Sequence, residues 1–104
     1  MIAEFSVCPT GTEHMSKDIA RVVEVLKASG LAYRLGPMGT CVEGNMEDIL
    51  TAIRHCHEAV RSQHDRVITT IMLDDRGPSP HRLSDMVACV EQQVGRSSLA
   101  LSDF

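Results

Sequence analysis

Hydrophobic and polar residues alternate over residues 2–9, which predicts a half-buried β-strand. Ala3, Phe5 and Val7 would point to one side of the sheet, and Ile2, Glu4, Ser6 and Cys8 to the other. A turn at residues 9–12 ends this strand, because its sequence Pro-Thr-Gly-Thr is rich in turn-forming residues.

The hydrophobic pattern then changes to a helical period. We predict a first helix with Ser16 as its N-cap, Asp18 in its first turn and Gly30 as its stop. A second helix would begin at Asn45, with Glu47 in its first turn. The apolar stripe of the first helix is Ile19, Val22, Val23 and Leu26, and that of the second is Met46, Ile49, Leu50, Ile53, Cys56 and Val60.

Between the helices, residues 31–35 and 38–43 flank a Gly-Pro pair and predict a β-hairpin. Gly39 lies inside the returning strand, where glycine indicates a bulge or a close approach to the backbone. We therefore expect free main-chain amides near Gly39 and Thr40, with the Glu43 carboxylate close by.

Residues 66–75 predict a last strand, and a third helix would run from Ser84 to Gly95. The order β-α-β-β-α-β with a terminal helix predicts an α+β ferredoxin-like sandwich. We expect one domain over residues 1–95 and a flexible tail over residues 96–104.

The last strand is apolar on both sides, which suggests that one of them is covered by a partner. Val67, Ile71 and Leu73 alternate with Ile68 and Met72. We expect homodimers or homotetramers formed through the sheets. Cover by the third helix is the alternative.

Composition narrows the function classes. The chain has 104 residues and a net charge of −4, without a basic cluster, which argues against nucleic acid. It contains neither an apolar run of membrane length nor a signal-peptide pattern, so we expect no membrane partner. Four dispersed cysteines and no export signal favour reduced thiols in the cytoplasm.

The candidate catalytic and metal-binding groups have simpler explanations. Residues 55–57, His-Cys-His, are adjacent on a helix and cannot converge on one ion, so we expect no metal and no cofactor. Only one aspartate of Asp74-Asp75-Arg76 can address a given site, since neighbours on a strand face opposite sides. Without a nucleophile–base pair, the pattern favours binding over catalysis.

The sequence resembles the YkoF-like thiamine-binding-protein family of small ferredoxin-like domains. The resemblance rests on the strings IAEFSVCPTGT, YRLGPMGT, VEG, RVIT and DDR, in that order. It implies a cytoplasmic, non-catalytic oligomer that binds thiamine or its hydroxymethylpyrimidine moiety. The loop GTEH and the segment Gly-Pro-Ser-Pro depart from the family's pattern.

The predicted ligand site combines the turn, the hairpin and two carboxylates. Peptide groups and the hydroxyl at Thr40 would bind the aminopyrimidine, and Met38 would form an apolar wall. Glu43 or Asp74 would balance the thiazolium cation. The predicted site residues are Thr10, Gly11, Thr12, Met38, Gly39, Thr40, Glu43 and Asp74.

Two other functions remain open at this point. One is a structural or regulatory oligomer that binds another protein, which the fold alone does not exclude. The other is a small dimeric ferredoxin-like enzyme, for which His14 would be the candidate base.

Overall fold

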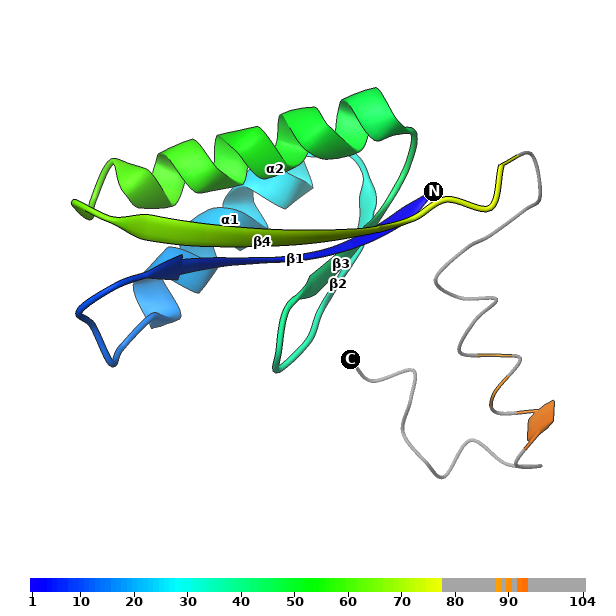
Figure 1. Ribbon diagram of the computed structural model, residues 1–104, viewed down its shortest axis with the longest axis horizontal. Helices are drawn as coiled ribbons and strands as arrows, with labels where there is room; N and C mark the ends of the chain where they lie inside the picture. The colour runs from blue at the N-terminus through cyan, green and yellow to red at the C-terminus, as the bar shows by residue number, and fades with distance from the viewer. Residues whose placement is uncertain (78–87, 89, 91, 94–104) are drawn as a thin grey trace.

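The computed structural model describes residues 1–77 together with Ala88, Val90, Gln92 and Gln93. Figure 1 shows one sheet with both helices on the same face. The predicted α+β ferredoxin-like fold is therefore confirmed. The elements are β1 (Ile2–Pro9), α1 (Ser16–Ser29), β2 (Ala32–Leu35), β3 (Thr40–Glu43), α2 (Met46–Arg61) and β4 (Val67–Asp74).

The predicted third helix and tail lie outside the described residues, apart from the four residues after position 77, which are helical. Among the helices that the structure describes, none combines the length and the apolar character needed to cross a bilayer.

The sheet has the order β2-β3-β1-β4, and every neighbouring pair is antiparallel. β1 pairs with β4 along its whole length, but with β3 only from Ile2 to Phe5. Beyond Phe5, the β2–β3 ribbon diverges from β1 toward its turn (Figure 1). The second half of β1 therefore has a strand neighbour on one side only.

The hydrophobic core lies between the sheet and the helices, on the side of the sheet to which Ala3, Phe5 and Val7 point. Phe5 is its largest sheet residue and is 2% exposed. Burying a side chain of this size stabilises the fold by about 1.5–3 kcal/mol. The other core residues are Ala3, Val22, Leu26, Val42, Ile49, Ala52, Ile53, Cys56 and Val60.

The two helices begin differently. Asn45 caps α2 as predicted, since its Oδ1 accepts the Asp48 N–H at 2.8 Å. The predicted Ser16 cap of α1 is wrong: the N-cap is Met15, whose carbonyl accepts the Ile19 N–H at 2.9 Å and which makes no side-chain cap. Ser16 already lies within the first turn, so its hydroxyl cannot act from the cap position.

The stop of α1 follows the prediction. Gly30 has a left-handed backbone with φ of 75°, and its N–H donates to the Lys27 carbonyl at 3.4 Å.

The hairpin turn is longer than the sequence predicted. The Gly36 N–H donates to the Gly39 carbonyl at 2.9 Å, so Gly39 belongs to the turn and β3 begins only at Thr40. The predicted strand over residues 38–43 therefore begins two residues too early, and of the two alternatives for Gly39 the bulge is wrong. The close approach at Gly39 is real but comes from β1, because an added Cβ would lie 3.1 Å from the Phe5 carbonyl oxygen.

Strand β4 is an edge strand with apolar groups exposed on both faces. Ile68 and Met72 are 49% and 68% exposed on the face away from the helices. Ile71 and Leu73 lie on the helix side and are still about two-fifths exposed, because α2 does not cover the sheet edge.

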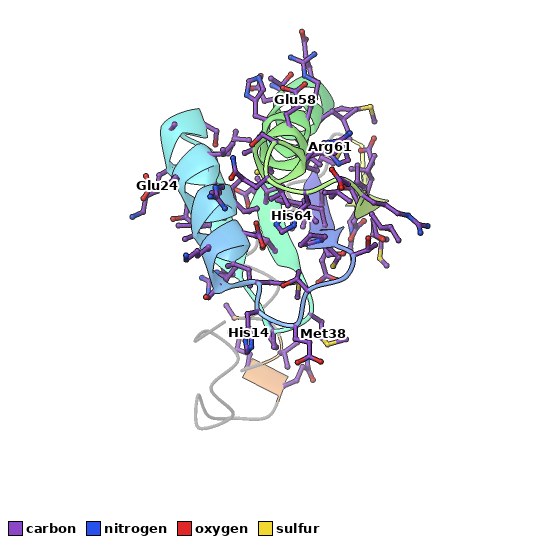
Figure 2. All side chains as sticks on the ribbon, turned by 90° about the vertical axis from the view of Figure 1, so that its left-hand side faces the viewer. His14, Glu24, Met38, Glu58, Arg61 and His64 are labelled. Carbon is purple, nitrogen blue, oxygen red and sulfur yellow. The ribbon has the colours of Figure 1, made fainter. Side chains whose placement is uncertain are left out.

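A buried carboxylate fixes the start of α1 against the turn before β4. Asp18 is 4% exposed, and its Oδ1 lies 2.8 Å from His64 Nε2 and 3.4 Å from Arg21 Nη1. His64 is partly buried, and Figure 2 shows it on the inner side of α1, where it reaches Asp18, whereas Glu24 of the same helix points away from the molecule.

We expect Asp18→Asn to lower the free energy of unfolding by about 1–3 kcal/mol, because it removes the charge from a buried hydrogen-bonded group. Urea denaturation measures the change. Glu24→Gln on the exposed face of α1 is the control and should change stability by less than about 0.5 kcal/mol. Equal stability of the two variants would contradict this role for Asp18.

Candidate functional site

A cavity of about 120 Å³ lies where β1 continues beyond β3. Three segments enclose it: the second half of β1, the start of α1 and the hairpin turn between β2 and β3. The lining residues are Phe5, Ser6, Val7, Cys8, Met15, Ile19, Val22, Leu35, Gly36, Pro37, Met38, Gly39 and Thr40.

The cavity wall is largely apolar and its volume suits a single ring. Phe5 and Val22 are buried within it, whereas Met38 is 87% exposed at the hairpin turn. Figure 2 shows Met38 and His14 at the same end of the molecule. An apolar cavity of about 150 Å³ is known to accept benzene, and typical ligand pockets are larger, about 300–1,000 Å³. A flat six-membered ring could enter this space, while a larger ligand would extend into solvent.

Thr40 contributes a buried polar group to this apolar wall. The residue is 6% exposed and lies opposite Phe5 on the helix-facing side of the sheet. Its hydroxyl has no hydrogen-bond partner within the part of the chain that the structure describes. An unsatisfied buried hydroxyl costs about 1–3 kcal/mol, and a ligand with a matching donor or acceptor would recover that energy.

The structure brings three of the predicted site residues together at the cavity: Met38, Gly39 and Thr40. The predicted carboxylates are elsewhere. Glu43 and Asp74 flank Ile2 in the sheet, at the opposite end of the strands from the hairpin turn. Glu43 is three residues along β3 from Thr40, about 10 Å away at 3.3 Å per residue.

The predicted turn residues Thr10, Gly11 and Thr12 follow the end of β1 and are not among the lining residues of the cavity. Gly11 has φ of 81°, and the Thr12 hydroxyl lies 3.3 Å from both the N–H and the carbonyl oxygen of His14. His14 is exposed and does not line the cavity. The turn therefore lies at the cavity's end of β1 without contributing to its wall.

Several lining residues were missed by reasoning from motifs, because they are apolar and resemble ordinary core residues. Met15, Ile19 and Val22 come from the start of α1, and Leu35 comes from the end of β2. The feature that creates the cavity is the difference in length between β1 and β3. The sequence pattern hid it, because it predicted a β3 that begins two residues earlier than the observed strand.

A second cavity of about 590 Å³ lies between α1 and α2. It is larger but open, and one of its polar residues, Asp48, already accepts a hydrogen bond from Asn45 Nδ2 at 3.0 Å. Its other lining residues are Val25, Ala28, Ser29, Leu31, Thr51, Ala52 and His55. The smaller cavity is the better candidate because it contains the unpaired hydroxyl.

Across the described residues, no three His, Cys, Asp or Glu side chains are grouped so that they could hold a metal ion. The cysteines differ in environment. Burial raises the pKa of the Cys56 thiol to about 11. Burial also raises the pKa of Cys41, and the Glu4 carboxylate, whose Oε2 lies 3.7 Å from Cys41 Sγ, raises it further. Cys8 is exposed and lines the cavity.

The family model and the similar sequences of known proteins agree with one another. A family model described as "Thiamine-binding protein" matches residues 3–91. A UPF0045 protein of Methanothermobacter thermautotrophicus is 35% identical over 96 residues, which cover 88% of this chain and 97% of the relative. The UPF0045 protein YqgV of Bacillus subtilis is 32% identical, with coverage of 89% and 96%.

Solved structures agree on the fold. Protein MJ1052 of Methanocaldococcus jannaschii superposes with a TM-score of 0.81 at 28% identity, covering 88% of this chain and 95% of that one. A Thermotoga maritima protein provisionally described as a thiamine biosynthesis/salvage protein gives a TM-score of 0.75 at 20% identity, with coverage of 86% and 96%. At that identity, the second similarity supports the fold alone.

Among the three cysteines in the described part of the chain, we expect thiol-alkylating reagents at pH 8 to modify Cys8 first, Cys41 more slowly and Cys56 only after unfolding. A raised pKa leaves less thiolate at a given pH, and the thiolate is the reactive form. Peptide mapping by mass spectrometry after timed quenching follows each cysteine separately. Modification of Cys56 as fast as that of Cys8 in the native protein would contradict the burial described here.

Proposed function

This chain belongs to the thiamine-binding protein family, and from that premise we propose that it binds thiamine or a related hydroxymethylpyrimidine without catalysing a reaction. We place the pyrimidine ring in the cavity between β1, the start of α1 and the hairpin turn. The proposed location in the cell is the cytoplasm, where such a protein would carry, buffer or sense the ligand.

The observation that carries this proposal is the buried, unpaired hydroxyl of Thr40 in an apolar cavity of single-ring size. An aminopyrimidine presents ring-nitrogen acceptors and an exocyclic amino donor, and a hydroxyl can pair with either. The apolar wall would contact the ring faces. Natural proteins retain a group that costs stability when function needs it.

The thiazolium part of thiamine would lie outside the cavity, near the exposed side chain of Met38. Glu43 and Asp74, which the sequence suggested as counter-ions, are at the other end of the sheet. We therefore restrict the proposed contacts from the predicted set to Met38, Gly39 and Thr40. On this proposal, hydroxymethylpyrimidine would retain most of the binding free energy of thiamine.

We also propose that the protein acts as a homodimer or homotetramer. The supporting observation is the exposure of apolar groups along the edge strand β4, with Met72 68% exposed and Ile68 49% exposed. Such a patch on a sheet edge favours association. The same strand supports a second candidate function, a protein-interaction module without a small-molecule ligand.

Replacing Thr40 with valine should separate binding from folding. Because the hydroxyl is buried without a partner, Thr40→Val should raise the free energy of unfolding by about 1 kcal/mol. The same change should weaken the binding of hydroxymethylpyrimidine about five- to tenfold, since it removes one hydrogen bond. Urea denaturation measures the first effect and calorimetry the second.

Thr69→Val is the matched control. The Thr69 hydroxyl lies 2.6 Å from His57 Nδ1 and outside the cavity. We expect this variant to lose stability and to keep the wild-type affinity. If Thr40→Val binds the pyrimidine as tightly as the wild type, Thr40 is not a ligand contact. If no pyrimidine or thiamine compound binds the wild type, the proposed function is wrong.

The oligomer proposal predicts that charge on β4 causes dissociation. The double variant Ile68→Lys/Met72→Lys should run as a monomer in size-exclusion chromatography with light scattering, while the wild type runs as a dimer or tetramer. Met46→Lys, at the start of α2 and 45% exposed in the wild type, is the control and should keep the wild-type mass. A monomeric wild type would contradict the proposal.

A further inference from the structure

The direction of each peptide group in β1 follows from two hydrogen bonds at its ends. The Met1 carbonyl accepts the Gly44 N–H at 3.0 Å, and the Thr10 N–H donates to the Arg66 carbonyl at 3.1 Å. In an antiparallel pair, hydrogen-bonded positions alternate along the strand. The odd-numbered residues of β1 therefore direct their N–H and C=O groups toward β3, and the even-numbered residues direct theirs toward β4.

Val7 is the first odd-numbered residue of β1 that has no partner residue in β3. Ala3 pairs with Val42 and Phe5 with Thr40, but the ladder between β1 and β3 ends there. The next partner in register would be Met38, which lies in the hairpin turn. In the described part of the chain, the Val7 N–H and C=O thus face the cavity without a strand partner.

Part of the hairpin's main chain is already paired. The Gly39 carbonyl accepts the Gly36 N–H, and the peptide groups of β3 pair alternately with β2 and β1. Main-chain groups that face the cavity without a strand partner therefore lie on the facing strand as well, at Val7. The cause is the difference in length between β1 and β3.

We propose that the Val7 N–H and C=O form the recognition edge of the cavity, where they bind a planar heterocycle that carries an acceptor next to a donor. This assignment rests on the proposed function and gives the ligand an orientation. In a 4-aminopyrimidine, the ring nitrogen accepts the Val7 N–H and the exocyclic amine donates to the Val7 carbonyl. The ligand edge thus replaces the missing residues of β3.

Thr40 supplies a third polar contact in this arrangement. It lies opposite Phe5, two residues before Val7 along β1, and its buried hydroxyl lines the same cavity. A heterocycle paired with Val7 therefore has the Thr40 hydroxyl within the same wall, and the apolar residues Val22 and Leu35 are available to its faces. The chemical class that fits is a small amidine- or lactam-containing ring.

Hydrogen exchange of individual amides in the wild-type protein is the primary test. The probe is 4-amino-5-hydroxymethyl-2-methylpyrimidine, with its analogue lacking the 4-amino group as the matched control ligand. At saturation, exchange of the Val7 amide should slow at least about tenfold, as expected for a new hydrogen bond. The Phe5 amide, which already pairs with β3, is the internal reference and should change little. The analogue should bind at least about tenfold more weakly.

Substitution provides an independent arm. Val7→Pro removes the N–H without breaking a hydrogen bond of the ladder, so the variant should keep its circular dichroism spectrum and lose pyrimidine binding. Val7→Ala keeps the N–H and should bind at least about tenfold more tightly than Val7→Pro, because it retains the main-chain hydrogen bonds and alters only side-chain packing.

The outcomes are distinguishable. Binding of the aminopyrimidine without protection of the Val7 amide, or equal affinity for the analogue, would overturn this assignment and leave the proposed function standing. Failure of every pyrimidine to bind would overturn the proposed function, and the assignment with it. If Val7→Pro does not fold, the exchange experiment in the wild type still decides.

Discussion

The site depends on the unequal pairing of β1, which continues for four residues beyond the end of its ladder with β3 while keeping its ladder with β4. The hairpin turn sets this limit, because the bond from Gly36 to Gly39 closes the ribbon before it can reach the end of β1. A central strand would ordinarily have all its peptide groups satisfied by two neighbours. Here β1 has no neighbour on its β3 side beyond Phe5, and the start of α1 and the hairpin turn leave a small cavity beside that part of the strand.

This arrangement lowers the stability of the fold around the candidate site. The buried hydroxyl of Thr40 has no partner in the described part of the chain and lowers the stability of the protein, since buried polar groups without partners are costly. The Val7 peptide is only half-buried. The surrounding contacts offset that cost: the apolar core under Phe5 and the ionic contacts of Asp18, which hold α1 in place. Two α1 residues that line the cavity, Ile19 and Val22, follow Asp18 in the same helix. Helix α1 therefore contributes both to the hydrophobic core and to the cavity wall.

Most of the fold was predictable from the sequence, because it follows from the periodicity of hydrophobic residues and from the residues that begin and end helices. The alternation in β1, the stripe of α2, the cap at Asn45 and the stop at Gly30 all had local causes. The α1 cap and the start of β3 were predicted wrongly, since both depend on how the chain enters an element. The lining of the candidate cavity was predictable only in part. Met38, Gly39 and Thr40, which line it, belong to the hairpin motif that the sequence singled out, whereas the position of Val7 depends on strand register, which no short motif contains.

The most direct test of the central claim is an intermolecular nuclear Overhauser measurement between 4-amino-5-hydroxymethyl-2-methylpyrimidine and the methyl-labelled protein. The account predicts contacts from the ligand's 2-methyl group to methyl groups of Ile19, Val22 and Leu35, which line the small cavity. Contacts instead to Val25, Leu31 and Ala52, which line the groove between α1 and α2, would contradict it.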